Sequence, residues 1–402
     1  MLKLGLIKEG KIPNDKRVAL TPKQCRRLRE IYPKIQIMIE PSASRSFMDE
    51  EYDEQCFVLN ENMEECDVLI GIKEVPVKSL IEGKTYLFFS HCAKKQERNK
   101  DLLKAVLKKN IRLIDFELLT DKQGRRLVGF GRFAGLVGTY NAMRGYCIRY
   151  KMPEPKPAHT LNSLKELFLQ AHKIKLPPIK IAFTGEGRVA GGVLEILQNM
   201  KIKQVTVEEY LAKELFEEPV FVQLKPADYY QPKKGGAFDF NHFVQNPEEY
   251  SGNFKRFCNT TDMFISSAYW DPRSPVLFTA EEMTEPSFRI RIIADITCDI
   301  QGSIPSTLRS AIIEDPFYGY NPFTRKEELA FTKPTNITVM AVDNLPNELP
   351  RDASEEFGNS LIEKIFPFFF EEDKDGIIER ATITRNGALT SRFEYLNDWL
   401  NS

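Results

Sequence analysis

An apolar strand runs straight into a glycine-rich loop in the stretch IKIAFTGEGRVAG, which occupies residues 179–191. The loop has the spacing G-x-G-x-x-A, with Gly185, Gly187 and Ala190 at its three fixed positions. Apolar residues then recur at helical spacing across residues 189–200. A strand, a tight loop and a helix in this order predict a βαβ unit, with an isolated structural glycine turn as the alternative.

Each fixed position of the loop has a steric or electrostatic task. Gly185 permits the tight turn, Gly187 lets the backbone approach a pyrophosphate, and Ala190 lets the helix pack close to the strand. The helix that begins near Arg188 directs free N–H groups and the positive end of its dipole at the same point. The loop therefore predicts a dinucleotide-binding Rossmann domain.

A second strand is predicted at residues 205–207, ending at Glu208, 23 residues after Gly185. An acid at the end of this strand accepts hydrogen bonds from the adenine-ribose hydroxyls and favours NAD. Glu209 is adjacent, and predicted strand ends are uncertain by about two residues, so it stays an alternative.

The rest of the chain alternates short apolar strands with amphipathic helices, which is typical of α/β proteins. The chain has 402 residues, more than the roughly 250–300 that one core sustains, so we expect two domains. The predicted strands outside the glycine-loop region include residues 2–7, 35–39, 68–72, 86–89, 111–115, 338–342 and 381–383.

Composition excludes several classes of function. The 56 Lys and Arg balance 57 Asp and Glu, so no bulk attraction to nucleic acid or an acidic membrane follows. No window approaches about 18 uninterrupted apolar residues. The seven cysteines form no CxxC pair, and the N-terminus has no apolar signal segment. We expect a cytoplasmic protein with reduced thiols and no metal, nucleic-acid or membrane partner.

Ionisable residues follow several predicted strands in the first 120 residues. Lys73 follows the strand at 68–72, His91 follows the one at 86–89, and Glu117 follows the one at 111–115. Ligands of open α/β sheets bind beyond the carboxyl ends of the strands. A lone histidine or lysine there is more often structural, but their joint placement makes an acid/base site a reasonable hypothesis.

Together these segments resemble the lysine–ketoglutarate reductase and saccharopine dehydrogenase family, which is distantly similar to alanine dehydrogenase. The resemblance covers nearly the whole chain in the same order. Its segments are DVLIGIK (67–73), KTYLFFSH (84–91), IRLIDFE (111–117), GRR (124–126), FGRFAG (130–135), ADITCD (294–299), VDNLP (342–346), LPRDAS (349–354) and ATITRNG (381–387).

The resemblance implies a particular domain order. A central dinucleotide-binding Rossmann domain, residues 135–329, is inserted into a discontinuous substrate domain that is also Rossmann-like. The substrate domain then comprises residues 1–134 and 330–402. The cofactor is NAD or NADP: Glu208 does not decide between them, because the reductase branch also has an acid there and uses NADP.

The resemblance also implies roles for individual residues. Lys73 and His91 match the family's catalytic pair, and Glu117 matches the acid that tunes the lysine. Asp295 matches an aspartate near the nicotinamide end of the cofactor. Ala190 replaces the glycine that is common in this loop.

Substrate carboxylates require cations. Arg17 and Arg126 match cations that lie near the substrate carboxylates in the family. Saccharopine has three carboxylates, and arginine forks suit them, so Arg125 and Arg132 are further candidates. A charged turn after residues 121–124 is the alternative for Arg125 and Arg126.

The activity implied is the interconversion of saccharopine with L-lysine and 2-oxoglutarate through an imine and a hydride transfer. Which of Lys73 and His91 acts at each proton transfer stays open. Two alternatives remain: an alanine-dehydrogenase-like enzyme acting on a small amino acid, and a non-catalytic nucleotide-binding regulator.

Overall fold

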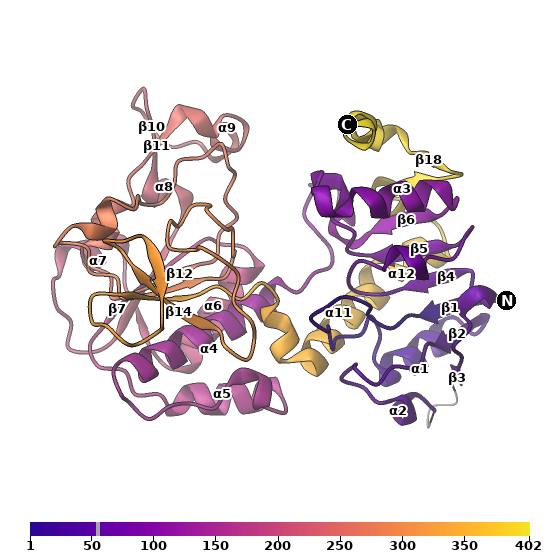
Figure 1. Ribbon diagram of the computed structural model, residues 1–402, viewed down its shortest axis with the longest axis horizontal. Helices are drawn as coiled ribbons and strands as arrows, with labels where there is room; N and C mark the ends of the chain where they lie inside the picture. Colours follow the sequence, from indigo (N-terminus) through magenta and orange to yellow (C-terminus); the bar gives the residue numbers. More distant parts are fainter. Residues whose placement is uncertain (54–56) are drawn as a thin grey trace. The chain divides into compact units, whose positions relative to one another are not determined.

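The computed structural model describes residues 1–53 and 57–402, which divide into two compact units. Unit 1 comprises Met1–Phe130 and Pro350–Ser402, and unit 2 comprises Gly131–Leu349. The chain leaves unit 1, builds unit 2 and then returns to unit 1 (Figure 1). Within the described residues, each unit has its own eight-stranded sheet.

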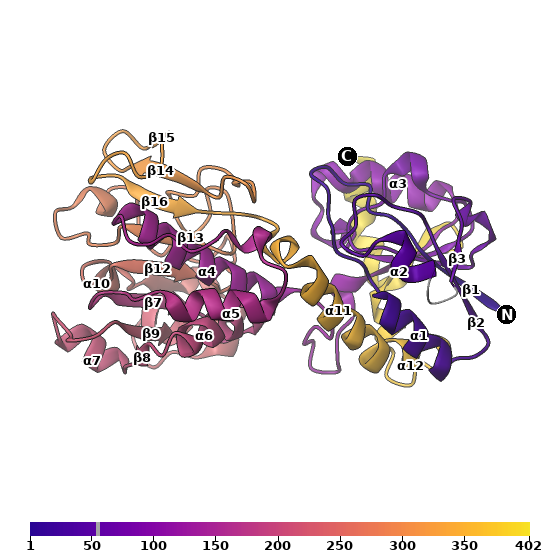
Figure 2. The same cartoon turned by 90° about the horizontal axis from the view of Figure 1, so that it is seen from below.

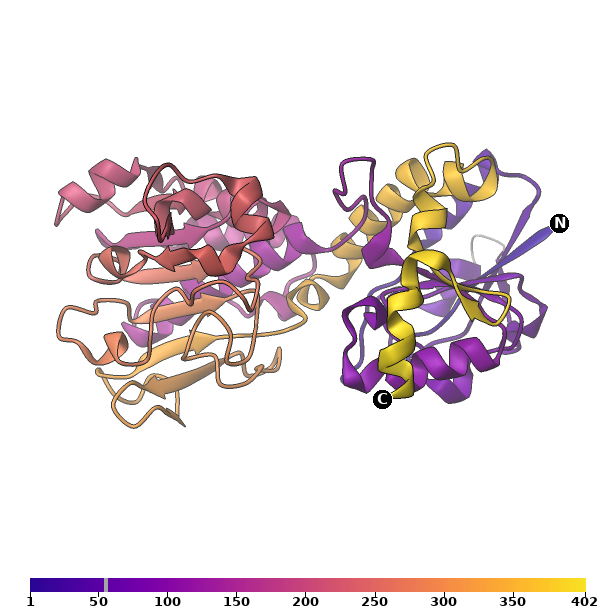
Figure 3. The ribbon, with the colours of Figure 1, turned by 90° about the horizontal axis from the view of Figure 1, so that it is seen from above.

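The sheet of unit 1 combines N-terminal and C-terminal strands. Its order is β18 (Ala388–Leu389), β17 (Thr382–Arg385), β6 (Arg112–Asp115), β5 (Thr85–Phe88), β4 (Val68–Ile70), β1 (Leu2–Leu6), β2 (Ile35–Ile39) and β3 (Val58–Leu59). The strands from β6 to β3 run parallel, whereas β17 and β18 are antiparallel additions. Figure 3 shows the C-terminal segment, in yellow, lying against the purple N-terminal elements of this unit.

Helices cover both faces of this sheet. They are α1 (Pro22–Ile31), α2 (Asp49–Asp53), α3 (Lys100–Lys108), α11 (Pro350–Lys364), α12 (Phe366–Phe370), α13 (Ile377–Ala381) and α14 (Asn397–Asn401). One buried apolar cluster joins the sheet to α1 through Leu28 and to α11 through Phe357. A second cluster joins the other face to α3 through Leu103 and to α14 through Leu400.

The sheet of unit 2 is also mostly parallel. Its order is β15 (Lys326–Glu328), β14 (Phe317–Asn321), β16 (Ile337–Met340), β13 (Ile292–Asp295), β12 (Met263–Ser266), β7 (Lys180–Thr184), β9 (Val220–Leu224) and β8 (Lys203–Gln204), as Figure 2 shows. Its antiparallel pairs are β14 with β16 and β14 with β15. From β7 the chain builds β8 and β9 on one side and then β12 on the other. This reversal creates a switch point of the kind at which ligands bind.

The described part of unit 2 also contains seven α-helices and one hairpin. They are α4 (Gly131–Arg149), α5 (Leu164–Lys173), α6 (Arg188–Asn199), α7 (Val207–Ala212), α8 (Pro226–Tyr229), β10 (Tyr230–Pro232), α9 (Phe240–Gln245), β11 (Tyr250–Gly252) and α10 (Lys255–Cys258). Helices α4 and α6 pack against each other at Gly135 and Gly192. A Cβ atom at either glycine would overlap backbone atoms of the other helix.

The predicted α/β architecture is confirmed, but both predicted domain boundaries are displaced. The boundary expected after residue 134 lies after Phe130, because Gly131 begins α4, which packs within unit 2. The boundary expected at residue 330 lies at Pro350. The reason is that β16 pairs with β13 and β14 and so completes the sheet of unit 2.

Two further observations concern the described residues alone. No helix among them is both long enough and apolar enough to cross a membrane. Six cysteines of this part of the chain are free thiols. The seventh, Cys56, lies outside the described residues.

Candidate active site

Lys73 and Glu74 lie on the loop that follows β4. The backbone N–H groups of Ile72 and Lys73 donate to the carboxylate of Glu9, at 2.6 and 2.8 Å. Glu9 follows β1, the strand next to β4, so its side chain ties the two strand ends together. Burial and the nearby charge of Asp15 raise the pKa of Glu9 to about 8.

The amine of Lys73 lies among cations as well as acids. Burial, followed by the positive charges of Arg17 and Lys11, lowers its pKa from 10.5 to about 8. The carboxylates of Asp15 and Glu74 act in the opposite direction. An amine with this pKa gains and loses a proton close to neutral pH, as general acid–base chemistry requires.

His91 follows β5 and has a left-handed backbone, with φ of 53°. Its Nδ1 lies 2.9 Å from Oε1 of Glu74. Burial acts to raise the pKa of Glu74, but the hydrogen bond with His91, a backbone hydrogen bond and the nearby positive charge together outweigh burial, and the pKa is about 2. Glu74 is therefore ionised and fixes the ring, with Nε2 on the side away from this carboxylate. Glu74 thus connects His91 with the surroundings of Lys73.

The backbone before His91 is held by buried polar groups. The hydroxyl of Ser90 donates to Asp115 at 2.5 Å, and the side chain of Asn99 donates to the carbonyl oxygen of Ser90 at 3.0 Å. Asp115 ends β6, the strand next to β5. Burial raises the pKa of Asp115. These contacts fix the strand end from which the imidazole projects.

Glu117 lies in the short 3-10 helix Phe116–Leu118, which follows β6. Its buried carboxylate forms ion pairs with Lys94, at 2.6 Å, and with Arg126. Burial acts to raise its pKa, but the charges of Arg126 and Lys94 outweigh it and hold the pKa below its usual value. That Glu117 tunes Lys73 stays a prediction, and the structure adds two acids, Asp15 and Glu74, whose charges raise the pKa of Lys73.

The predicted carboxylate-binding arginines of unit 1 differ in their surroundings. Arg17 is buried, donates to both oxygens of Asp15 at 2.9 and 2.5 Å, and lies 4.1 Å from the ring centre of Phe130. Arg126 is half-exposed and pairs with Glu117. Arg125 is exposed and pairs with Asp121 at 2.7 Å, as a charged turn would require.

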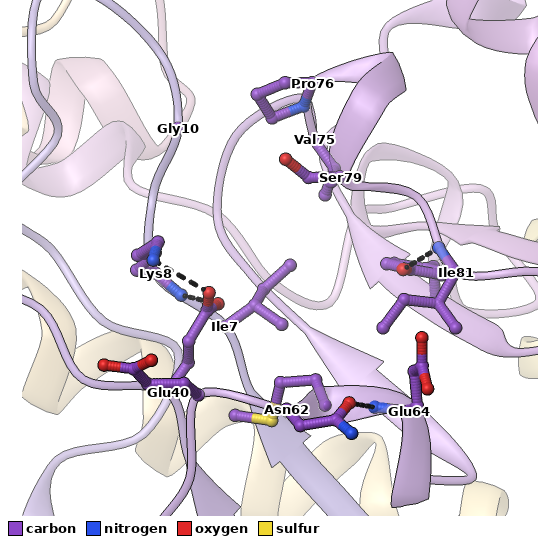
Figure 4. Close-up of a pocket in the computed structure, with 13 residues that line it drawn as sticks. Ile7, Lys8, Gly10, Glu40, Asn62, Glu64, Val75, Pro76, Ser79 and Ile81 are labelled. Atoms are coloured by element: carbon purple, nitrogen blue, oxygen red, sulfur yellow. Dashed lines mark hydrogen bonds and ion pairs between the residues drawn. The ribbon is translucent and has the colours of Figure 1, made fainter.

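A cavity of about 300 Å³ in unit 1 is lined in part by the segment that follows Lys73 and Glu74 (Figure 4). Val75 and Pro76 form part of its wall, and Lys8 pairs there with Glu40 at 3.1 Å. Two more glutamates line it, and the predicted acid/base residues do not. An acidic wall repels carboxylates, so this cavity does not suit a tricarboxylate substrate.

The glycine loop of unit 2 has the predicted form. It joins β7 to α6, and Gly185 has a φ of +100°, which a residue with a side chain rarely adopts. Gly187 is the N-cap of α6, and a Cβ atom built there meets no described atom within 4 Å. Arg188 begins the helix and Ala190 is buried behind the loop. The open space above Gly187 and the helix N-terminus fit a dinucleotide pyrophosphate.

The predicted strand at residues 205–207 is wrong. The strand is β8, which ends at Gln204, and Thr206 then caps α7. Glu208 is an exposed residue in the first turn of α7, and Glu209 completes the capping box with Thr206. Neither glutamate ends a strand, so the sequence-based reason for assigning either to the adenine ribose is lost.

Two other predicted residues of unit 2 have structural partners. Asp295 ends β13 and accepts hydrogen bonds from the hydroxyls of Thr297 and Thr307, at 2.6 and 2.7 Å. Burial raises the pKa of Asp295. Arg132 lies on α4, in unit 2, and pairs with Glu195 of α6 at 2.6 Å. The predicted role of Arg132 at a substrate carboxylate stays a prediction.

Comparisons with known proteins agree with the resemblance seen in the sequence. Residues 5–137 match the family model of the alanine dehydrogenase/PNT N-terminal domain. Alpha-aminoadipic semialdehyde synthases are 26% identical in Arabidopsis thaliana, over 98% of this chain, and 27% in Mus musculus, over 95%. Saccharopine dehydrogenase [NAD(+), L-lysine-forming] of Emericella nidulans is 25% identical over 87% of this chain and 88% of its own length. The chain is a homologue of these enzymes.

The chain spans less than half of the semialdehyde synthases it matches, 41% of the plant protein and 46% of the mouse protein. Among solved structures, an L-alanine dehydrogenase superposes with a TM-score of 0.67 at 15% identity, covering 99% of this chain and all of that one. A transhydrogenase from Sinorhizobium meliloti superposes with a TM-score of 0.58 at 13% identity, covering 96% of this chain and all of that one. These likenesses establish the two-domain Rossmann-like fold.

Glu9, Asp15 and Glu74 were not among the residues that the sequence predicted for this site. All three follow parallel strands, β1 or β4, at the edge where Lys73 also lies. The available signal was the run of charges directly after β1. Those charges lie at the same edge of the sheet as Lys73 only because β1 lies beside β4.

Proposed function

We propose that this chain is an NAD(P)-dependent oxidoreductase that interconverts saccharopine with L-lysine and 2-oxoglutarate. The observation that carries the proposal is the group formed by Lys73, Glu74 and His91. It combines an amine of lowered pKa with an imidazole held by an ionised carboxylate. Homology to dehydrogenases that act on amino acids supports the same class of reaction.

The proposed reaction needs proton transfers at two atoms. The ε-amine of lysine attacks the keto carbon of 2-oxoglutarate, and loss of water leaves an imine. A nicotinamide cofactor, when bound, supplies the hydride that reduces the imine carbon. Lys73 and His91 accept a proton from the attacking nitrogen and donate one to the departing hydroxyl. Glu74 keeps the imidazole in one orientation throughout.

Positive charge near this group supports a substrate with several carboxylates. We propose that Arg17 and Arg126 each bind a substrate carboxylate, with Lys94 and Lys11 adding to the local field. Arg132 of unit 2, which pairs with Glu195, stays a further candidate for a substrate carboxylate.

For the cofactor we propose NADP rather than NAD. In Rossmann domains, the residue that ends the strand beside the glycine-loop strand meets the adenine ribose. Here that strand is β9, and the next residue is Lys225, paired with Glu186 at 2.9 Å. A cation there favours a 2′-phosphate, although the name of the fungal relative specifies NAD(+).

A nicotinamide absorbance assay tests the proposal directly. The purified protein is given NADPH or NADH with L-lysine and 2-oxoglutarate, and in parallel with pyruvate and ammonia. Oxidation of NADPH or NADH in the mixture with L-lysine and 2-oxoglutarate, and not in the mixture with pyruvate and ammonia, supports the proposed activity. Oxidation with pyruvate and ammonia would instead make it an alanine-dehydrogenase-like enzyme, as the matched family model also allows. No oxidation in either mixture would support a non-catalytic nucleotide-binding protein.

A further inference from the structure

Arg17, the buried cation proposed above to bind a substrate carboxylate, has a backbone that is held from both sides. The carbonyl oxygen of Lys16 accepts a hydrogen bond from the N–H of Ser46 at 2.8 Å. The N–H of Val18 donates to the hydroxyl of Ser354, on α11, at 2.9 Å. With the backbone fixed in this way, the contacts of the side chain decide where the guanidinium lies.

Two of those contacts act on different parts of the guanidinium. Asp15 lies along one edge, where Nε and a terminal nitrogen of Arg17 donate to its two oxygens. The ring of Phe130 lies against the flat side, with its centre 4.1 Å from the guanidinium carbon. An ion pair along one edge leaves the guanidinium able to tilt about that edge, and a ring against its face opposes the tilt.

Phe130 is supported from behind by a second ring. It stacks on Phe357, with ring centres 4.5 Å apart and planes 13° apart. Two groups this close to one ring cannot share a face, so the ring of Phe130 lies between Arg17 and Phe357. Phe357 belongs to α11 and is 1% exposed. The aromatic support of Arg17 therefore rests on a residue of the buried core.

The same group of rings extends to the candidate catalytic residues. Phe357 also meets Phe116 and Phe89, with ring centres 5.2 and 6.0 Å away. Phe89 in turn lies beside His91, with ring centres 6.3 Å apart. These four phenylalanines form one aromatic cluster, and Phe130 is the member that meets the arginine.

We propose that Phe130 is a positioning residue, which holds the guanidinium of Arg17 at the substrate carboxylate through a cation–π contact. This inference rests on the proposed function. A cation is attracted to the face of an aromatic ring, and the attraction is stronger where water is excluded. Water is excluded here, because the side chains of Arg17 and Asp15 are 3% and 1% exposed. Phe130 acts through Arg17 and takes no part in proton transfer.

The position of Arg17 also affects the amine of Lys73. Burial lowers the pKa of Lys73 most, and the positive charge of Arg17 comes next, ahead of that of Lys11. Asp15 and Glu74 act in the opposite direction. A guanidinium that the ring no longer holds would lower the pKa of Lys73 less, so that pKa would rise above about 8. The neutral amine would then form at higher pH.

Ring fluorination tests the contact with little change of shape. Fluorine atoms withdraw electron density from the ring face, so adding them to Phe130 one at a time weakens a cation–π contact stepwise. Binding of 2-oxoglutarate to the complex of the protein with NADPH is measured by calorimetry, without L-lysine so that no turnover occurs. We expect each fluorine to weaken this binding further, and Phe130→Leu to weaken it by about 5- to 30-fold. The affinity for NADPH should not change.

Two further variants separate positioning from packing. Phe116→Leu is the matched control, since Phe116 is a buried member of the same cluster whose ring meets Phe89 and Phe357. Phe116→Leu, and Phe130→Tyr, which keeps the ring, should leave the affinity for 2-oxoglutarate unchanged.

The pH profile gives an independent measurement of the same role. In Phe130→Leu, the rising limb of kcat/KM against pH should move to higher pH, whereas Phe116→Leu should leave it in place. An affinity for 2-oxoglutarate that does not respond to fluorination would overturn the proposal, even if Phe130→Leu binds weakly, because the ring would then only fill space.

The positioning role and the proposed function fail in different ways. If 2-oxoglutarate binds and fluorination has no effect, the proposed function stands and Phe130 is structural. If 2-oxoglutarate does not bind the unmodified protein, the proposed function fails, and urea unfolding of Arg17→Met, Phe130→Leu and the double variant tests the contact instead. Losses of stability that add would overturn the contact, and non-additive losses would support it.

Discussion

Glu74→Gln removes one charge at the centre of the candidate active site and keeps the shape of the side chain. Glu74 holds Nδ1 of His91 at 2.9 Å, and the two side chains are only 13% and 21% exposed. A hydrogen bond to a charged group contributes about 1.5–3 kcal/mol, and little of that is lost to solvent screening here. Because His91 transfers a proton in the proposed reaction, we expect the turnover of the Glu74→Gln variant to fall about 10- to 150-fold.

The same substitution has a second effect, on Lys73. The charge of Glu74 raises the pKa of Lys73, whose value is about 8, so its loss lowers that pKa further. The neutral amine then forms at lower pH. The rising limb of kcat/KM against pH, measured from initial rates of NADPH oxidation, should move to lower pH.

Glu82→Gln is the matched control, since Glu82 is an exposed acid on the connection between β4 and β5. It should leave both the rate and the pH profile unchanged. The role given to Glu74 would be refuted if the Glu74→Gln enzyme kept its turnover within about threefold of the unmodified protein and the rising limb of kcat/KM against pH did not move.

Four further substitutions test other parts of the structure. Lys73→Met should remove the rise of kcat/KM near pH 8 and leave the affinity for NADPH, measured by fluorescence titration, unchanged. Gly187→Val should abolish NADPH binding with an unaltered circular dichroism spectrum, because its side chain meets only open space. Gly192→Ala should lower the free energy of unfolding by about 1–3 kcal/mol in urea titrations, through overlap with α4, whereas Gly191→Ala should not. Lys225→Ala should raise KM for NADPH about tenfold and leave KM for NADH unchanged.

The glycine loop could be predicted because its signal is local. A strand, two glycines and a helix within a dozen residues specify the turn by their own steric requirements. The helix found where a second strand was predicted also has a local signal. The sequence Thr206-Val207-Glu208-Glu209 has the capping-box spacing that starts a helix. The strand itself, β8, has only two residues, and so short a segment shows no alternating pattern by which its bounds could be predicted.

The partners in the candidate site could not be predicted in the same way. Lys73 and His91 were recognisable because each directly follows an apolar strand. Glu9 accepts hydrogen bonds from the Lys73 loop, although the donors lie 63 and 64 positions further along the chain. This contact forms because β1 pairs with β4 in the sheet. Strand order is a property of the whole sheet, so the sequence alone did not reveal Asp15 and Glu74 as acids whose charges act on Lys73.

The division of unit 1 into two segments also affects how the chain assembles during synthesis. Unit 2 is continuous, so it can collapse once Leu349 has left the ribosome. The edge of β6 stays unpaired until β17 has been made, because β17 covers that edge. At about 5–20 residues per second, the nascent chain carries this bare edge for tens of seconds. Open strand edges invite pairing with other chains, so this interval is when the protein is most exposed to aggregation.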